Sequence, residues 1–138
     1  MCIRDSTSSE NKEIINLTNS DITEYNLTWS KDGTEIFYTS YEKTGRKVKS
    51  VNVSDKSIKV FINDSTIQSV NDVSKDNERM IISSSEHHKK GELYLYDIET
   101  NSKIRITNNE FYEAGAKFSP DEKTVSYTHL TLPTIYSV

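Results

Sequence analysis

Cysteine, proline and glycine are all scarce in this 138-residue sequence, which has one Cys, two Pro and four Gly. Because Cys2 is the only cysteine, a disulfide within the chain is excluded. The sequence also lacks a Gly-rich phosphate-binding loop and the Gly-x-Ser-x-Gly elbow of serine hydrolases. It therefore offers no motif for phosphate binding or for nucleophilic catalysis, and we expect no catalytic residue and no cofactor.

An excess of positive charge and long hydrophobic runs are missing as well. The 21 acidic and 17 basic residues are interleaved along the chain and leave a formal net charge of −4. This distribution differs from the clustered basic footprint of nucleic-acid-binding proteins. No apolar run approaches the roughly 20 residues of a membrane-spanning helix. We therefore expect neither a nucleic-acid partner nor a membrane span within this sequence.

The residues that are plentiful favour β-strands. Hydrophobic residues make up only 33% of the chain, but β-branched residues and tyrosine are common. Short runs of these residues are separated by polar turns, as in segments 35–40, 47–53, 79–84 and 92–98. No window shows a helical period with caps. The pattern predicts an all-β fold built from short strands.

Two sequence markers recur with a period of about 45 residues. The first marker is Trp29-Ser30-Lys31-Asp32-Gly33, Val73-Ser74-Lys75-Asp76-Asn77 and Phe118-Ser119-Pro120-Asp121-Glu122. The second is Leu17-Thr18-Asn19, Phe61-Ile62-Asn63 and Ile106-Thr107-Asn108, in the same phase. Four short strands in a period of this length are typical of a β-propeller blade. We predict blades over residues 20–64 and 65–109, and the start of a third over 110–124.

The first marker contains the elements of a tight turn. Asp32, Asp76 and Asp121 recur once per repeat, which indicates that each carboxylate bonds backbone N–H groups in a turn rather than acting in catalysis. The next residue must accept a positive φ. Glycine and asparagine do so easily, whereas Glu122 does so poorly, which predicts a looser turn or another turn type in the third repeat.

These turns, together with the run from Glu92 to Asn108, resemble the repeats of TolB-type, WD-like β-propellers. In that family a Trp-Ser-Pro-Asp-Gly turn precedes a strand, and each blade closes near a Leu-Thr-Asn. The resemblance implies a partial β-propeller with about two four-stranded antiparallel blades and the edges of neighbouring blades. It further implies a non-enzymatic scaffold that binds another protein or peptide, or a small ligand, in a periplasmic or extracytoplasmic location.

The same resemblance leaves two other functions open. Such propellers also form the gating domain of serine peptidases of the prolyl-oligopeptidase or dipeptidyl-peptidase type, whose catalytic domain would then lie outside this sequence. They occur as surface lipoproteins as well. A Gly-x-Ser-x-Gly downstream of Thr124 would indicate the peptidase, and a lipobox upstream of Thr7 would indicate the lipoprotein.

Aromatic and histidine side chains are the remaining candidates for a functional role. The aromatic residues at repeat positions are expected to fill the space between blades; they are Trp29, Phe37, Tyr94, Tyr96 and Phe118. Tyrosines near strand ends are the candidate contact residues on a face of the propeller; they are Tyr25, Tyr41 and Tyr112. His87 and His88 lie in a polar loop without a cysteine or a third histidine nearby, so we expect a solvated loop and no metal site.

The two ends of the chain are expected to be foreign to the protein. Residues 1–6 match a translation of the common transposon-end sequencing adapter, and residues 125–138 match its reverse complement with the index that follows. Such segments are set aside before the fold is considered. The native part is then residues 7–124, which has no cysteine. Residues 124–130 are nevertheless expected to form a strand, because they follow the turn at Ser119-Pro120-Asp121.

Overall fold

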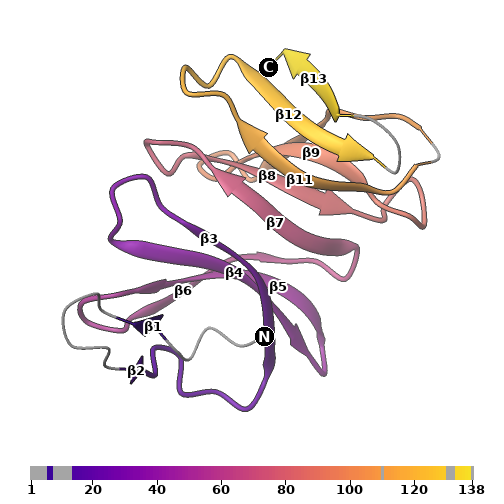
Figure 1. Ribbon diagram of the computed structural model, residues 1–138. Helices are drawn as coiled ribbons and strands as arrows, with labels where there is room; N and C mark the ends of the chain where they lie inside the picture. The colour runs from indigo at the N-terminus through magenta and orange to yellow at the C-terminus, as the bar shows by residue number, and fades with distance from the viewer. Residues whose placement is uncertain (1–5, 8–13, 110, 130–132, 138) are drawn as a thin grey trace.

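The computed structural model describes residues 6–7, 14–109, 111–129 and 133–137. Apart from one two-stranded pair, they form three antiparallel sheets, with the second lying between the other two (Figure 1). The first sheet contains β3 (Thr23–Trp29), β4 (Glu35–Glu42), β5 (Gly45–Asn52) and β6 (Ile58–Asn63). The second contains β7 (Ile67–Val73), β8 (Arg79–Ser84), β9 (Glu92–Asp97) and β10 (Ser102–Arg105). The third contains β11 (Glu113–Phe118), β12 (Thr124–His129) and β13 (Pro133–Ser137).

Each sheet is an up-and-down meander in which neighbours in sequence are neighbours in space, the arrangement of a propeller blade. A short antiparallel pair is formed by β1 (Ser6–Thr7) and β2 (Ile14–Ile15) (Figure 1). The described residues contain no helix, and hence none able to cross a bilayer. The prediction of an all-β partial propeller is confirmed.

The turn between the first two strands of each sheet has one geometry in all three repeats. In the first, the Ser30 hydroxyl donates to Asp32 (2.6 Å) and accepts from the Glu35 N–H (3.0 Å), while Asp32 accepts from the Thr34 N–H (3.0 Å). Equivalent bonds connect Ser74 with Asp76 and Ser119 with Asp121. The predicted turn role of the three aspartates is confirmed.

The expectation of a looser third turn is wrong. Glu122 adopts φ 58°, close to the 60° of Asn77, and its N–H donates to the Ser119 carbonyl at 2.9 Å. The reason lies in the preceding sheet. The Glu122 carboxylate accepts from the Lys75 N–H (2.5 Å) and from the Arg79 guanidinium (3.2 Å). These contacts offset the conformational cost of a left-handed glutamate.

Three hydrophobic clusters form the core, and two of them lie between the sheets. Phe37, Val48 and Ile62 of the first sheet pack with Val73 and Met80 of the second and with other side chains of the same cluster. The second cluster joins the far face of the second sheet to the third sheet; its members include Ile81, Leu93, Ile106, Phe118 and Val125. The second sheet therefore buries one face against the first sheet and the other against the third.

Among the aromatic residues predicted to lie between blades, Trp29 is the exception. Phe37, Tyr94, Tyr96 and Phe118 are buried as predicted. Trp29 is 52% exposed, whereas Val73 and Phe118 at the corresponding positions are 0% and 9% exposed. Each of those two packs against the preceding sheet, and no four-stranded sheet among the described residues precedes β3. Trp29 is exposed because its side of the first sheet lacks that neighbour.

The strand predicted over residues 124–130 is present as β12 (Thr124–His129), and residue 130 lies outside the described residues. It pairs with β11, and Val125 and Tyr127 turn inward into the second hydrophobic cluster. The alternation of valine, serine, tyrosine and threonine in this segment meets the requirement of a strand with one buried face. The origin of residues 125–138 in an adapter stays a prediction.

Candidate binding face

The three tyrosines singled out in the sequence come from three separate elements. Tyr25 lies on β3, Tyr41 near the end of β4, and Tyr112 just before β11. Tyr41 and Tyr112 are 58% and 54% exposed, and Tyr25 is half-buried. The Tyr25 hydroxyl donates to the Gln68 carbonyl of the second sheet at 2.9 Å, so it also ties the two sheets together.

Strand register and the cavity lining place the three tyrosines near one another, because Tyr41 pairs with Thr23, two residues before Tyr25, and Tyr112 lines a cavity together with Asn26. Burial is the largest cause of the raised pKa of Tyr25, and the charge of Arg46 opposes it. Tyr112 and Tyr41 both act to raise the pKa of Tyr25 further. The structure therefore brings the three tyrosines of the sequence prediction into one group.

Arg46 belongs to this group, and the sequence analysis missed it. It is the cross-strand partner of Tyr41 in the β4–β5 hairpin, and its guanidinium lies over the Tyr41 ring, 5.4 Å from the centroid. Its Nε is buried and has no hydrogen-bond partner among the described residues. The sequence could have placed Arg46 beside Tyr41, because the two residues flank a short turn between two predicted strands and such residues pair across the turn.

A cavity of about 350 Å³ adjoins this group and runs along the first strands of the three sheets. Its lining residues come from β3, β7 and β11 and from the chain just before β11; they include Asn26, Asn71, Tyr112 and Lys117. Amide, phenol and ammonium groups supply both donors and acceptors. The tyrosine group therefore continues into a polar hollow.

Asp72 sits behind this wall and connects the three sheets. The side chain is 1% exposed, and its carboxylate accepts from the Phe118 N–H of β11 at 2.9 Å. It also accepts from Lys31 (3.0 Å) and Thr28 (3.5 Å), and Lys117 lies 3.8 Å away. These contacts fix the relative positions of β3, β7 and β11, and so the shape of the wall.

The two histidines of the β8–β9 loop lie elsewhere. His87 Nδ1 is 2.6 Å from the Tyr94 hydroxyl and its ring stacks on Tyr94, while His88 accepts from the Lys90 N–H. Within the ranges that the structure describes, no three His, Cys, Asp or Glu side chains gather as a metal site. The exposed His87 thus makes a local contact with Tyr94 and, among the described residues, is not part of a metal-binding cluster.

Comparison with known proteins shows similarity in fold. No family model matches the sequence, and no curated protein matches it. Among solved structures, TolB from Acinetobacter baumannii aligns over 92% of this chain with a TM-score of 0.78 and 21% identity. A putative TolB from Agrobacterium tumefaciens aligns over 84% with a TM-score of 0.72 and 17% identity. A prolyl endopeptidase aligns over 95% with a TM-score of 0.64 and 10% identity.

This chain spans only part of each of these proteins, namely 32%, 41% and 21% of their respective lengths. At these identities the similarity concerns the arrangement of strands and blades. The repeat markers, the meander topology and the alignments agree on that arrangement. The described part of the chain therefore has the fold of a segment of a TolB-like β-propeller.

Proposed function

We propose that the chain is part of a non-enzymatic propeller whose tyrosine-bearing face binds a peptide segment of another protein. The observation that carries the proposal is the grouping of Tyr25, Tyr41 and Tyr112 around Arg46, whose Nε is buried and has no hydrogen-bond partner in the described part of the chain. Tyrosine and arginine are the residue types enriched at protein interfaces, because each combines a large contact area with polar groups. Arg46 would pair with a carboxylate of the peptide.

The test is a selection of peptides from a random displayed library on the full 138-residue chain. Peptides that carry an acidic residue and lose at least about tenfold in affinity for Tyr41→Ala, Tyr112→Ala and Arg46→Met would support the proposal. The matched control is Ile104→Ala, which changes another exposed side chain, 69% exposed, on β10. Peptides that bind the three variants as tightly as the unmodified chain would contradict it.

A second candidate is the gating domain of a serine peptidase, favoured by the structural similarity to the prolyl endopeptidase. The gene sequence downstream of Thr124 distinguishes the two functions. A Gly-x-Ser-x-Gly codon pattern there would favour the peptidase. Further blades followed by a stop codon would exclude it.

The proposal takes residues 7–124 as the native part, with blades over 20–64 and 65–109 and a third beginning at 110–124. Residues 1–6 and 125–138 are then adapter-encoded. Sequencing the uninterrupted gene tests this directly. Different codons at both ends would support the assignment, and the same codons continuing into longer reading frames would refute it.

A further inference from the structure

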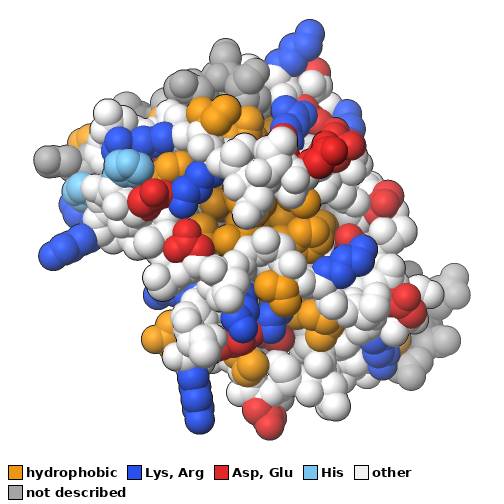
Figure 2. Space-filling model, turned by 180° about the vertical axis from the view of Figure 1, so that it is seen from behind, with side chains coloured by type: hydrophobic (Ala, Val, Ile, Leu, Met, Phe, Trp, Pro, Cys, Tyr) orange, Lys and Arg blue, Asp and Glu red, His pale blue; other side chains and the backbone are white. Residues whose placement is uncertain are grey.

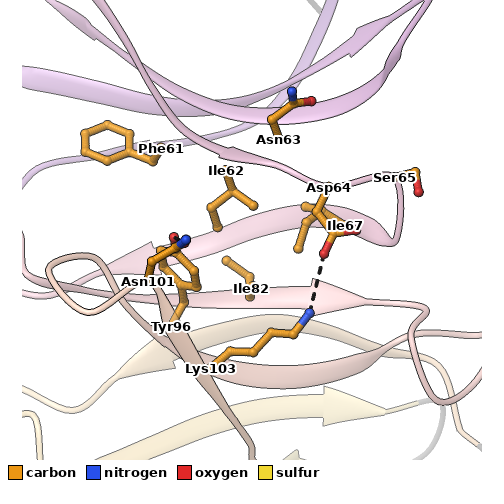
Figure 3. Close-up of a pocket in the computed structure, with 10 residues that line it drawn as sticks. All are labelled: Phe61, Ile62, Asn63, Asp64, Ser65, Ile67, Ile82, Tyr96, Asn101 and Lys103. Atoms are coloured by element: carbon orange, nitrogen blue, oxygen red, sulfur yellow. Dashed lines mark hydrogen bonds and ion pairs between the residues drawn. The ribbon is translucent and has the colours of Figure 1, made fainter.

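A second and larger cavity, of about 670 Å³, lies between the first and second sheets, away from the tyrosine group. One side is formed by the end of β6 and the β6–β7 turn, and the other by β9 and β10 (Figure 3). Seen from behind, the molecule shows hydrophobic side chains at the centre of this view, with acidic and basic side chains beside them (Figure 2). The volume lies within the range of small-molecule sites.

The part of the cavity wall that belongs to the core is apolar. Ile62, Ile67, Ile82 and Tyr96 line it, and all four belong to the core between the first two sheets. Phe61 is partly buried against that core, with its ring 5.3 Å from the Phe37 ring. A ring or carbon face of a ligand therefore has a rigid surface on which to pack.

The rim carries polar groups with unused hydrogen-bonding capacity. Asp64 Oδ1 accepts from the Thr66 N–H and hydroxyl at 2.8 Å each, but Oδ2 has only Lys103, at 3.5 Å (Figure 3). Asn101 accepts from the Tyr96 hydroxyl through Oδ1, and within the described part of the chain its amide NH₂ makes no hydrogen bond. Two amide donors and one carboxylate oxygen therefore remain for a ligand.

The charges at the rim select the class of ligand. Lys103 is held by Glu86 at 2.6 Å and by Asp64 at 3.5 Å, so two carboxylates surround one ammonium. An anion would meet an excess of negative charge, and a cation would have to displace Lys103. A hydroxyl group is both donor and acceptor, so it can donate to Asp64 and accept from Lys103 without disturbing the pair.

We infer that this cavity binds a neutral saccharide of one or two rings, with a hydroxyl between Asp64 and Lys103 and a sugar face on Phe61. The Asn101 amide donates to a second hydroxyl. The site is independent of the tyrosine face, because none of the residues that line it belongs to that group. Its ligand would bind in the millimolar range typical of a few hydrogen bonds and one stacked ring.

The experiment is saturation-transfer NMR on the full 138-residue chain with cellobiose and maltose, and in parallel with galacturonate and glucosamine. We expect transfer to at least one neutral disaccharide at about 10 mM and at least about tenfold weaker binding for Asp64→Asn and Lys103→Met. Lys43→Met is the matched control, since Lys43 is exposed and makes no hydrogen bond or ion pair among the described residues. Circular dichroism checks that each variant keeps its strands.

Transfer to neither neutral sugar would overturn the inference. Preferential transfer to galacturonate or glucosamine would overturn the assignment of a neutral ligand. Binding that is unchanged in folded Asp64→Asn, or that is lost in Tyr112→Ala, would place the sugar outside this cavity and would equally refute it. Loss of sugar binding with peptide binding intact would leave the proposed function standing.

Discussion

Replacing Asp72 is the perturbation for which the structure gives the clearest magnitude. The carboxylate is 1% exposed and joins three sheets through the Phe118 N–H, Lys31 and Thr28. Asp72→Ala leaves the Phe118 N–H without its acceptor and removes a charge-assisted bond worth about 1.5–3 kcal/mol. Lys31 adds less, because its side chain is 39% exposed and stays hydrated when the carboxylate is removed.

We therefore expect Asp72→Ala to lower the free energy of unfolding by about 2–4 kcal/mol. Asp72→Asn keeps an acceptor for the Phe118 N–H and should cost about half as much. The measurement is urea unfolding of the full chain, followed by circular dichroism below the concentration at which it associates. Asp21→Ala is the control, since Asp21 is exposed and makes no hydrogen bond or ion pair within the described ranges; its effect should stay below about 0.5 kcal/mol.

A second measurement locates the effect. Amide hydrogen exchange at Phe118 should accelerate in Asp72→Ala, while exchange in β4 and β5 changes less. Equal destabilisation by Asp72→Ala and Asp21→Ala would refute the reasoning, since it would show that the carboxylate connects nothing. So would a Phe118 amide whose exchange is unaffected.

Three further predictions concern the turns and the exposed side of the first sheet that carries Trp29. Glu122→Gly should destabilise the chain by about 1 kcal/mol in urea unfolding although it relieves the positive φ, because it removes the bonds to Lys75 and Arg79; a gain in stability would contradict this. The pKa of Asp32 is lowered from 3.8 to about 2, chiefly by hydrogen bonds from Ser30 and Thr34. Because the folded-state pKa is lowered, this stabilisation is complete above about pH 4 and is lost as the pH falls towards 2. Asp32→Asn should therefore weaken the pH dependence of the unfolding midpoint between about pH 4 and pH 2. An unchanged pH dependence in this range would count against the prediction. The exposed Trp29 face should make the chain self-associate in sedimentation velocity, and Trp29→Glu should shift it towards monomer; a chain that stays monomeric at every concentration would disprove this.

The sequence predicted features that recur in every repeat. The turns at Asp32, Asp76 and Asp121 and the strands between them depend on local hydrogen bonds and alternation, which a period of 44 or 45 residues makes visible. The burial of Phe37 was predicted in the same way, from its repeat position in a strand. The prediction that Trp29 is buried was wrong, because burial at this position depends on a neighbouring sheet rather than on the strand that carries Trp29.

The candidate site was less predictable, because its residues do not share one repeat position. Tyr25, Tyr41 and Tyr112 were identified by residue type and by their place near strand ends, and the strand register and the cavity lining place them near one another. Lys103 was missed because an isolated basic residue in a strand has no distinctive sequence pattern, whereas Arg46 could have been placed by its pairing with Tyr41 across the short turn. Only the pairing of strands and the packing of sheets places such residues against aromatic rings.

Asp72 shows that the repeat period could also have predicted contacts between neighbouring sheets. Thr28, Asp72 and Lys117 stand at one repeat position on β3, β7 and β11, and the three side chains converge at the Asp72 carboxylate. In a stack of similar sheets, equivalent positions on the first strands lie next to one another, so residues 44 or 45 apart act as neighbours. A hydroxyl, a carboxylate and an ammonium at one position of successive repeats are complementary in that setting, whereas within a single repeat each would look like an isolated polar residue. Chemistry in a propeller is therefore better sought by comparing equivalent positions across repeats than by scanning for motifs along the chain.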